Sequence, residues 1–210
     1  MTVASIVAIG TVIGGSLAAL NTSTNQAAVT EITTNAFSVG ITSAGKDLST
    51  SESLDDEAMP GADYDVKYCA TNEGGSSGGY DMYVRVTITK QWTDDTELDG
   101  TLIELDSLDG TSSYEESLAS QGWLVGSENS EQIVLYYTKA VSYGESTSNF
   151  IDGVSLPGSL GNEYTGQGIG LDISVNAVQV ENAQSAMQAE WGVSPVFDSD
   201  GNLTAVSEEF

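Results

Sequence analysis

The sequence predicts an all-β protein with one or two short helices, in which antiparallel strands form a two-sheet β-sandwich or jelly roll. Two observations support this fold class. Short segments of alternating apolar and polar residues recur along the chain, which is the pattern of strands with one buried face. The chain also has 23 glycines among 210 residues, and Gly-rich turns between short strands are typical of sandwiches and barrels.

The N-terminal segment has the pattern of an export signal. Residues 2–20 carry no charge, and the run ends in small residues at 14–19. Signal peptidases cleave after small residues, so we expect residues 1–19 to be a leader with Ala18 and Ala19 at the cleavage site. The first basic residue is Lys46, and a leader normally begins with basic residues, so a retained membrane anchor and a structural apolar helix remain alternatives.

Residues 20–34 follow the leader as a polar arm without Gly or Pro. An extended arm of this kind can add as a strand to the exposed edge of a sheet. The candidate donor-strand contacts are its apolar residues Ala27, Ala28, Val29 and Ile32. A disordered or self-packed N-terminal segment is the alternative interpretation.

Residues 35–196 contain the predicted strands and form the expected jelly-roll domain. The expected strands are 35–42, 63–71, 80–89, 133–137, 147–151 and 168–175, with a short apolar run at 102–105. Residues 182–191 have the apolar spacing of a short helix. Residues 197–210 are expected to be a polar, acidic C-terminal tail.

The clearest strand is 80–89, where apolar and polar residues alternate from Met82 to Thr89. A slip of one residue would bury Arg85, so the register is well specified. The residues expected in the core are Val84, Val86, Ile169, Leu171 and Ile173. Cys69, in the strand 63–71, is expected to be a small buried residue.

The composition excludes several classes of function. Five Lys and Arg residues stand against 31 Asp and Glu residues, a net charge of −26. So acidic a surface repels phosphates, and we expect neither nucleic-acid binding nor attraction to anionic lipids. The chain has no histidine, which excludes Ser-His-Asp and Cys-His catalysis and the zinc-protease motif His-Glu-x-x-His.

No combination of residues indicates an active site, so no catalytic residue, cofactor or specific metal site is expected. Residues 198–202 resemble the beginning of a calcium loop, but Leu203 stands where that loop requires Gly, so we expect a turn. The acidic, Ser-rich residues 45–62 are expected to be a connection, with a solvated acidic run at 54–57. The Gly-rich residues 74–79 lack the Lys and helix of a phosphate-binding loop. Weak association of Ca²⁺ with the acidic surface remains plausible.

Several segments together resemble the TasA/camelysin family of secreted proteins from Gram-positive bacteria, whose leaders are removed by a SipW-type signal peptidase. The similar segments are 14–21, Asn35-Ala36-Phe37 through Gly40, Met59-Pro60-Gly61, Lys67, 71–74, Tyr83-Val84-Arg85-Val86, 136–139, 144–147, Phe150 and 177–191. They cover roughly residues 10–195. The resemblance depends on their shared order.

The resemblance implies a jelly-roll protein of an extracellular fibre or biofilm matrix. Members of the family polymerise by donor-strand exchange, in which the N-terminal strand of one subunit completes the sheet of the next. The implied partners are other copies of the chain and a signal peptidase during export, with no stable membrane insertion after processing. The alternatives are a monomeric cell-surface or adhesion module and a camelysin-like metalloendopeptidase; because the chain lacks histidine, we expect no enzyme.

Overall fold

The computed structural model describes residues 39–43, 46–47, 51–55, 59–74, 79–92, 98–128 and 132–208, the first three ranges by their backbone only. In this part of the chain the protein is mostly β, its strands pair antiparallel, and it has two short α-helices. The prediction of an antiparallel all-β protein with one or two short helices is confirmed at this level.

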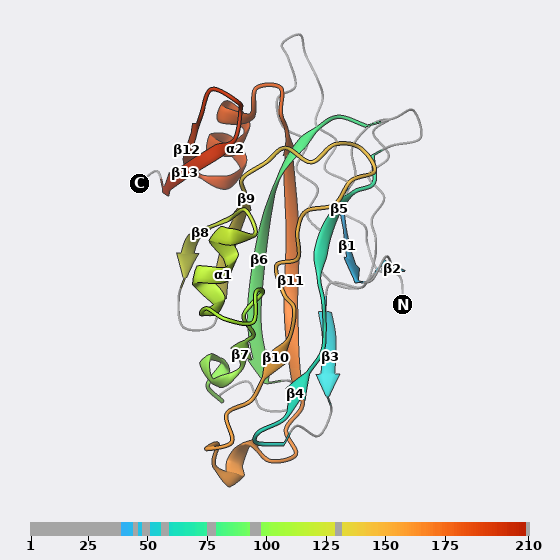
Figure 1. Cartoon of the computed structure of the whole chain (residues 1–210), viewed down its shortest axis with the longest axis vertical. Coiled ribbons are helices and arrows are strands. Elements are labelled where there is room, and N and C mark those ends of the chain that lie inside the picture. Colours follow the sequence, from blue (N-terminus) through green and yellow to red (C-terminus); the bar gives the residue numbers. More distant parts are fainter. Residues whose placement is uncertain are drawn as a thin grey trace, which may run out of the picture.

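The described elements follow one another along the chain as shown in Figure 1. The strands are β1 (Val39–Ser43), β2 (Lys46–Asp47), β3 (Ser51–Asp55), β4 (Asp63–Tyr64), β5 (Cys69–Asn72), β6 (Met82–Trp92), β7 (Glu104–Leu105), β8 (Trp123–Glu128), β9 (Gln132–Tyr137), β10 (Val154–Ser155), β11 (Ile169–Gln179), β12 (Val193–Phe197) and β13 (Leu203–Glu208). The α-helices are α1 (Tyr114–Ser120) and α2 (Ala183–Trp191), and the 3-10 helices are η1 (Gly100–Leu102) and η2 (Asn162–Tyr164).

The centre of the fold is a five-stranded sheet in the order β3-β11-β6-β9-β8. β6 and β11 pair along their whole length, from Met82 opposite Gln179 to Trp92 opposite Ile169. The five residues expected in the core, Val84, Val86, Ile169, Leu171 and Ile173, are all buried. Arg85 lies on the opposite face, against α2, so the predicted register of β6 is confirmed.

A second, less regular layer forms where residues 61–72 run antiparallel to residues 144–156. β4 pairs with β10, and an isolated bridge joins Tyr68 to Ile151. β7 pairs with the other side of β10, and β1 pairs with β5. The predicted strand 147–151 is wrong as a regular strand. Phe150 and Ile151 are neighbours and both fully buried, whereas a regular strand with one exposed face alternates its side chains between two sides.

The apolar side chains form two clusters, one on each face of the five-stranded sheet. The larger cluster lies on the face of β6 and β11 that carries Val84 and Leu171, and it packs against the second layer and Leu118 of α1. The smaller cluster joins Tyr83 of β6 and Tyr136 of β9 to α2 and to the β12–β13 hairpin. Figure 1 shows α2 and this hairpin together at one end of the sheet. The predicted helix 182–191 is confirmed, and it begins at Ala183 because Asn182 has a left-handed φ of 62°.

Two regions expected to be irregular contain strands. Residues 203–208, part of the expected tail, form β13 because Leu203 and Val206 pack into the smaller cluster while the backbone pairs with β12. Residues 51–55, part of the expected acidic connection and of the run 54–57, form β3, which pairs with β11. Backbone pairing at a sheet border does not require an apolar alternation, so the sequence pattern did not indicate β3.

Candidate assembly interface

The sequence-predicted site residues lie outside the part of the chain that the structure describes. These are the expected cleavage site, Ala18 and Ala19, and the expected donor-strand contacts, Ala27, Ala28, Val29 and Ile32. The described residues include the sheets to which such an arm would add. Sheet borders present backbone N–H and C=O groups that a further strand can bind, so these borders are the candidate site.

β8 is one border of the five-stranded sheet (Figure 1). It pairs with β9 on its inner side. Among the described residues, no backbone hydrogen bond joins its outer side to another segment. β8 and the helix α1 before it are not among the predicted elements. Trp123-Leu124-Val125 is nevertheless an apolar run, and the capping box of Ser113 and Glu116 at the start of α1 is visible in the sequence.

β8 contains one charged residue, Glu128, at its end. Residues 123–127 contain no charged side chain, and Val125 is 39% exposed. A β-bulge lies between Val125 and Ser127. At Gly126 a Cβ atom would lie 2.2 Å from Cε2 of Tyr136, so the tyrosine ring occupies the space of the missing side chain and only glycine fits. The backbone of this border is therefore covered by few side chains of its own.

Two other borders of the described sheets, β3 and β12, differ from β8 in chemistry. β3, the opposite border of the same sheet, contains Glu52 and Asp55 and is followed by Asp56 and Glu57. Charges on a border strand oppose the addition of another strand. β12 of the C-terminal hairpin contains Pro195, which has no N–H group to donate.

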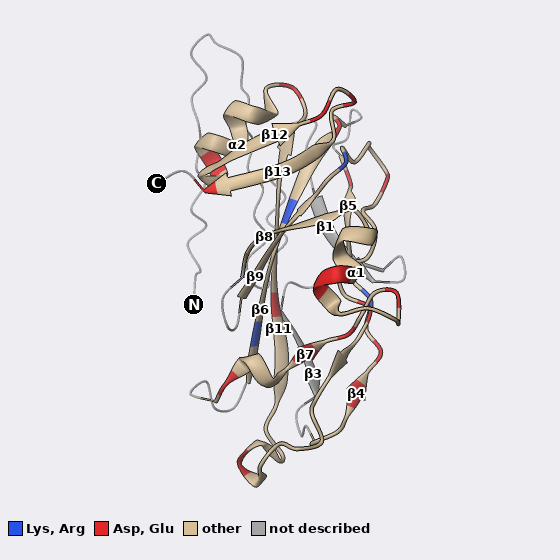
Figure 2. Ribbon diagram, turned by 60° about the vertical axis from the view of Figure 1, so that its left-hand side comes forward, with Lys and Arg blue, Asp and Glu red and all other residues tan. Residues whose placement is uncertain are grey.

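Arg85 packs inside the fold, although its buried Nε has no hydrogen-bond partner among the described residues. Its Nη2 donates to Oδ1 of Asn176 at 2.8 Å, and its guanidinium carbon lies 5.2 Å from the centre of the Trp191 ring. Burial lowers the pKa of Arg85, an effect that Tyr136 opposes. Arg85 therefore attaches β6 and β11 to α2. Figure 2 shows that basic residues are sparse among the acidic residues in the described part of the chain.

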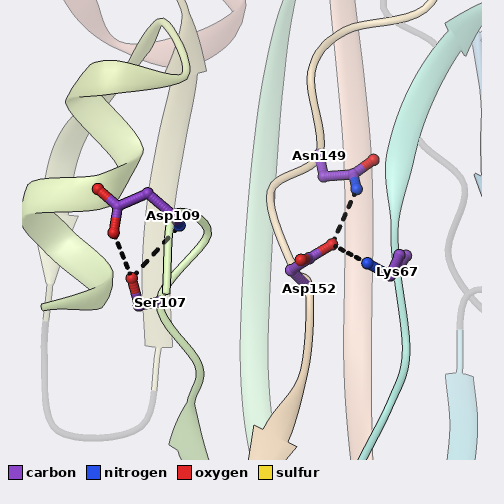
Figure 3. Close-up of polar contacts among 5 residues, drawn as sticks. All are labelled: Lys67, Ser107, Asp109, Asn149 and Asp152. Carbon is purple, nitrogen blue, oxygen red and sulfur yellow. Dashed lines mark hydrogen bonds and ion pairs between the residues drawn. The ribbon is translucent and has the colours of Figure 1, made fainter. Parts of the chain in front are cut away.

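Acidic side chains in the turns bind their own backbone. Asp109 accepts hydrogen bonds from the N–H groups of Thr111 and Ser112. It also accepts one from the hydroxyl of Ser107, which Figure 3 shows. These bonds, led by the backbone of Ser112, hold the pKa of Asp109 well below its usual range. Within the described ranges, no three or more Asp, Glu, Cys or His residues form a group that could hold a metal ion.

The predicted turn at Asp200-Gly201-Asn202 is confirmed as part of the connection between β12 and β13. Asp198 accepts from Asp200 N at 2.9 Å and from Asn202 N at 2.8 Å. Gly201 has a φ of 82°, a left-handed conformation that favours glycine. Hydrogen bonds from Asn202 are the main cause of a lowered pKa at Asp198.

One ion pair joins the two segments of the irregular layer. Lys67 Nζ lies 3.0 Å from Oδ1 of Asp152, and Asn149 Nδ2 donates to the same oxygen at 3.1 Å (Figure 3). The hydrogen bond to Asp152 raises the pKa of Lys67. Cys69 nearby is half-buried rather than buried as expected, because its neighbours Tyr68 and Ala70 take the core-facing positions of this segment.

In the described residues, no helix combines the length and apolar character needed to cross a membrane. No protein-family model, curated protein or solved structure matches this chain. The resemblance to the TasA/camelysin family therefore stays a prediction from the sequence motifs.

Proposed function

We propose that this protein is a secreted structural subunit of an extracellular fibre or biofilm matrix. In this proposal the arm at residues 20–34 of one copy adds as a strand to a sheet of the next copy. The observation that carries the proposal is the open border of the five-stranded sheet at β8, whose outer backbone groups have no partner among the described residues. The ordered resemblance to the TasA/camelysin family, a family of matrix fibres, supports the same function.

We also infer that the domain is a jelly-roll-like sandwich. Support comes from the larger apolar cluster, which has the five-stranded sheet on one side and the ribbon of residues 61–72 and 144–156 on the other. Two antiparallel layers enclosing one core are the basis of sandwiches and jelly rolls. In such an architecture the sheet borders, rather than a pocket, are the natural points of contact between copies.

The charge of the chain predicts how assembly depends on conditions. Copies with a net charge of −26 repel one another. Added salt shortens the screening length to about 10 Å near 0.1 M, and acid neutralises carboxylates, so both should accelerate assembly. Non-specific aggregation would have the same salt dependence, and a test must therefore address the arm itself.

The test compares chains that begin at Leu20 by negative-stain electron microscopy over a range of salt concentrations and pH values. The unmodified chain should form ordered filaments. A chain that lacks residues 20–34 should form none while its β-sheet circular dichroism is retained. A matched variant with Val29→Ser and Ile32→Ser keeps the length and charge of the arm but removes apolar contacts, so it should assemble poorly.

Ordered filaments that persist without residues 20–34 would disprove assembly through the arm. A chain that stays monomeric at every salt concentration and pH would disprove the fibre function and favour a monomeric surface or adhesion module.

A further inference from the structure

We infer that β8 is the border that accepts the arm of the neighbouring copy. The partner is thus a second copy of this chain, and the seam is the pairing of its residues 20–34 with β8. This acceptor assignment rests on the proposed function and specifies where on the fold the contact forms.

Charge distinguishes β8 from the opposite border of the same sheet. The arm contains one charged residue, Glu31, and β8 with the two residues after it (123–130) contains one, Glu128. By contrast, residues 51–57, which include β3, contain four acidic residues. Two copies that each carry a net charge of −26 meet with the least local repulsion where the two surfaces carry the fewest charges. The β8 border carries fewer charges than the β3 border.

The backbone geometry of β8 also suits an added strand. Thr138 N donates to Gly122 O at 2.9 Å, so Gly122 directs its carbonyl toward the β9 side. Alternation along an antiparallel strand then directs the backbone groups of Trp123 and Val125 away from β9. The exposed side chain of Val125 lies beside these groups and offers an apolar contact to the incoming arm.

The C-terminal hairpin is a poorer acceptor. Pro195 removes one donor from β12, and in β13 Leu203 N already donates to Thr138 O at 2.7 Å. Val196 on β12 is nevertheless 55% exposed, more than Val125. Val196 is therefore a matched control, because a contact that depended only on exposed apolar surface would favour Val196.

Disulfide trapping between copies that begin at Leu20 and are otherwise complete tests the assignment to β8. In a Cys69→Ser background, one preparation carries Val29→Cys in the arm, and the others carry Val125→Cys, Val196→Cys or Ser53→Cys. Mixed copies are oxidised under assembly conditions, and the linked peptides are quantified by mass spectrometry. Linkage to position 125 should exceed linkage to position 196 or 53 by about tenfold, because pairing in the seam raises the effective concentration of the two thiols. Repeating the trap with Ala27→Cys and Ile32→Cys covers the other registers of the arm.

Filaments whose arm links to position 53 or 196 as efficiently as to position 125 would overturn the assignment to β8 and leave the proposed function standing. If no filaments form in the unmodified chain, the proposed function itself fails. As a second measurement, Val125→Pro removes an outward N–H without removing a bond between β8 and β9, so it should abolish filaments while the circular dichroism of the monomer is unchanged. Filaments that form normally from folded Val125→Pro protein would also contradict the assignment.

Discussion

The replacement Asn72→Asp tests the polar contact at the base of the Gly-rich loop. Asn72 is 1% exposed. Its Nδ2 donates to the carbonyl oxygens of Tyr80 and Val141, both at 2.9 Å, and its Oδ1 accepts from Gly74 N at 3.2 Å. One side chain thus joins β5 to the beginning of β6, to the segment after β9 and to the loop. These contacts give a physical reason for an asparagine at position 72, two residues before Gly74.

Aspartate has nearly the same shape as asparagine, but when ionised it has no donor for the two carbonyl groups. Each unpaired buried polar group costs about 1–3 kcal/mol, so together with the buried charge we expect a loss of about 3–5 kcal/mol of unfolding free energy at neutral pH. Burial should raise the carboxyl pKa above its unfolded value, so the folded state binds the proton more tightly. The loss should therefore shrink as the pH falls, to about 1–2 kcal/mol near pH 4, where the protonated carboxyl donates one bond.

The assay is urea denaturation of the variant and the unmodified protein at neutral pH and near pH 4. The difference between the two proteins is the quantity to compare, because the other carboxylates titrate in both. Asn72→Ala is the control: it also removes both donors but has no carboxyl group, so its loss should change little between the two pH values. A loss from Asn72→Asp below about 1 kcal/mol, or equal at both pH values, would refute the reasoning.

Three further predictions concern the core, the loop and the acidic turns. Val86→Ala should lower the unfolding free energy by on the order of 1–3 kcal/mol, because Val86 is fully buried. Thr87→Ala on the other face should cost less than about 0.5 kcal/mol. Equal denaturant midpoints for the two variants would contradict the register of β6. Gly74→Ala should destabilise the fold, because Gly74 has a φ of 60° and an added Cβ would lie 2.2 Å from the Tyr143 ring. Calorimetry should show that a second substitution, Tyr143→Ala, restores part of the lost stability. If it restores none, the clash with Tyr143 is not the cause. Asp109→Asn should lower the melting temperature at neutral pH. Because the folded pKa of Asp109 is depressed, the difference in melting temperature between the variant and the unmodified protein should shrink as the pH falls below the unfolded pKa of about 3.9. A difference in melting temperature that does not depend on pH would exclude the charge of Asp109 as the cause.

The amino-acid sequence alone determined the secondary structure wherever apolar residues recur with the spacing of a strand or a helix. In β6 the alternation from Met82 to Ile88 places one set of side chains in the core and Arg85 on the other face, because a one-residue shift would exchange the two sets. The apolar spacing of residues 183–191 determined α2 in the same way. Local chemistry also determined the turn at Asp198, whose carboxylate binds its own backbone two and four residues further on.

Only the tertiary structure decided which segments pair and which strands lie at the borders of the described sheets. β3 pairs Asp55 with Ile169, far away in the sequence, and no local pattern encodes such a pairing because a border strand is held by backbone groups that every residue has. The burial of both Phe150 and Ile151 likewise depends on the segments packed around them, and no alternation of apolar residues in the sequence indicates it. Among the described residues, the outer side of β8 has no backbone partner. The sequence determined that residues 123–127 carry no charge. The place of β8 at the border depends on non-local hydrogen bonds, which form only once the sheet has assembled.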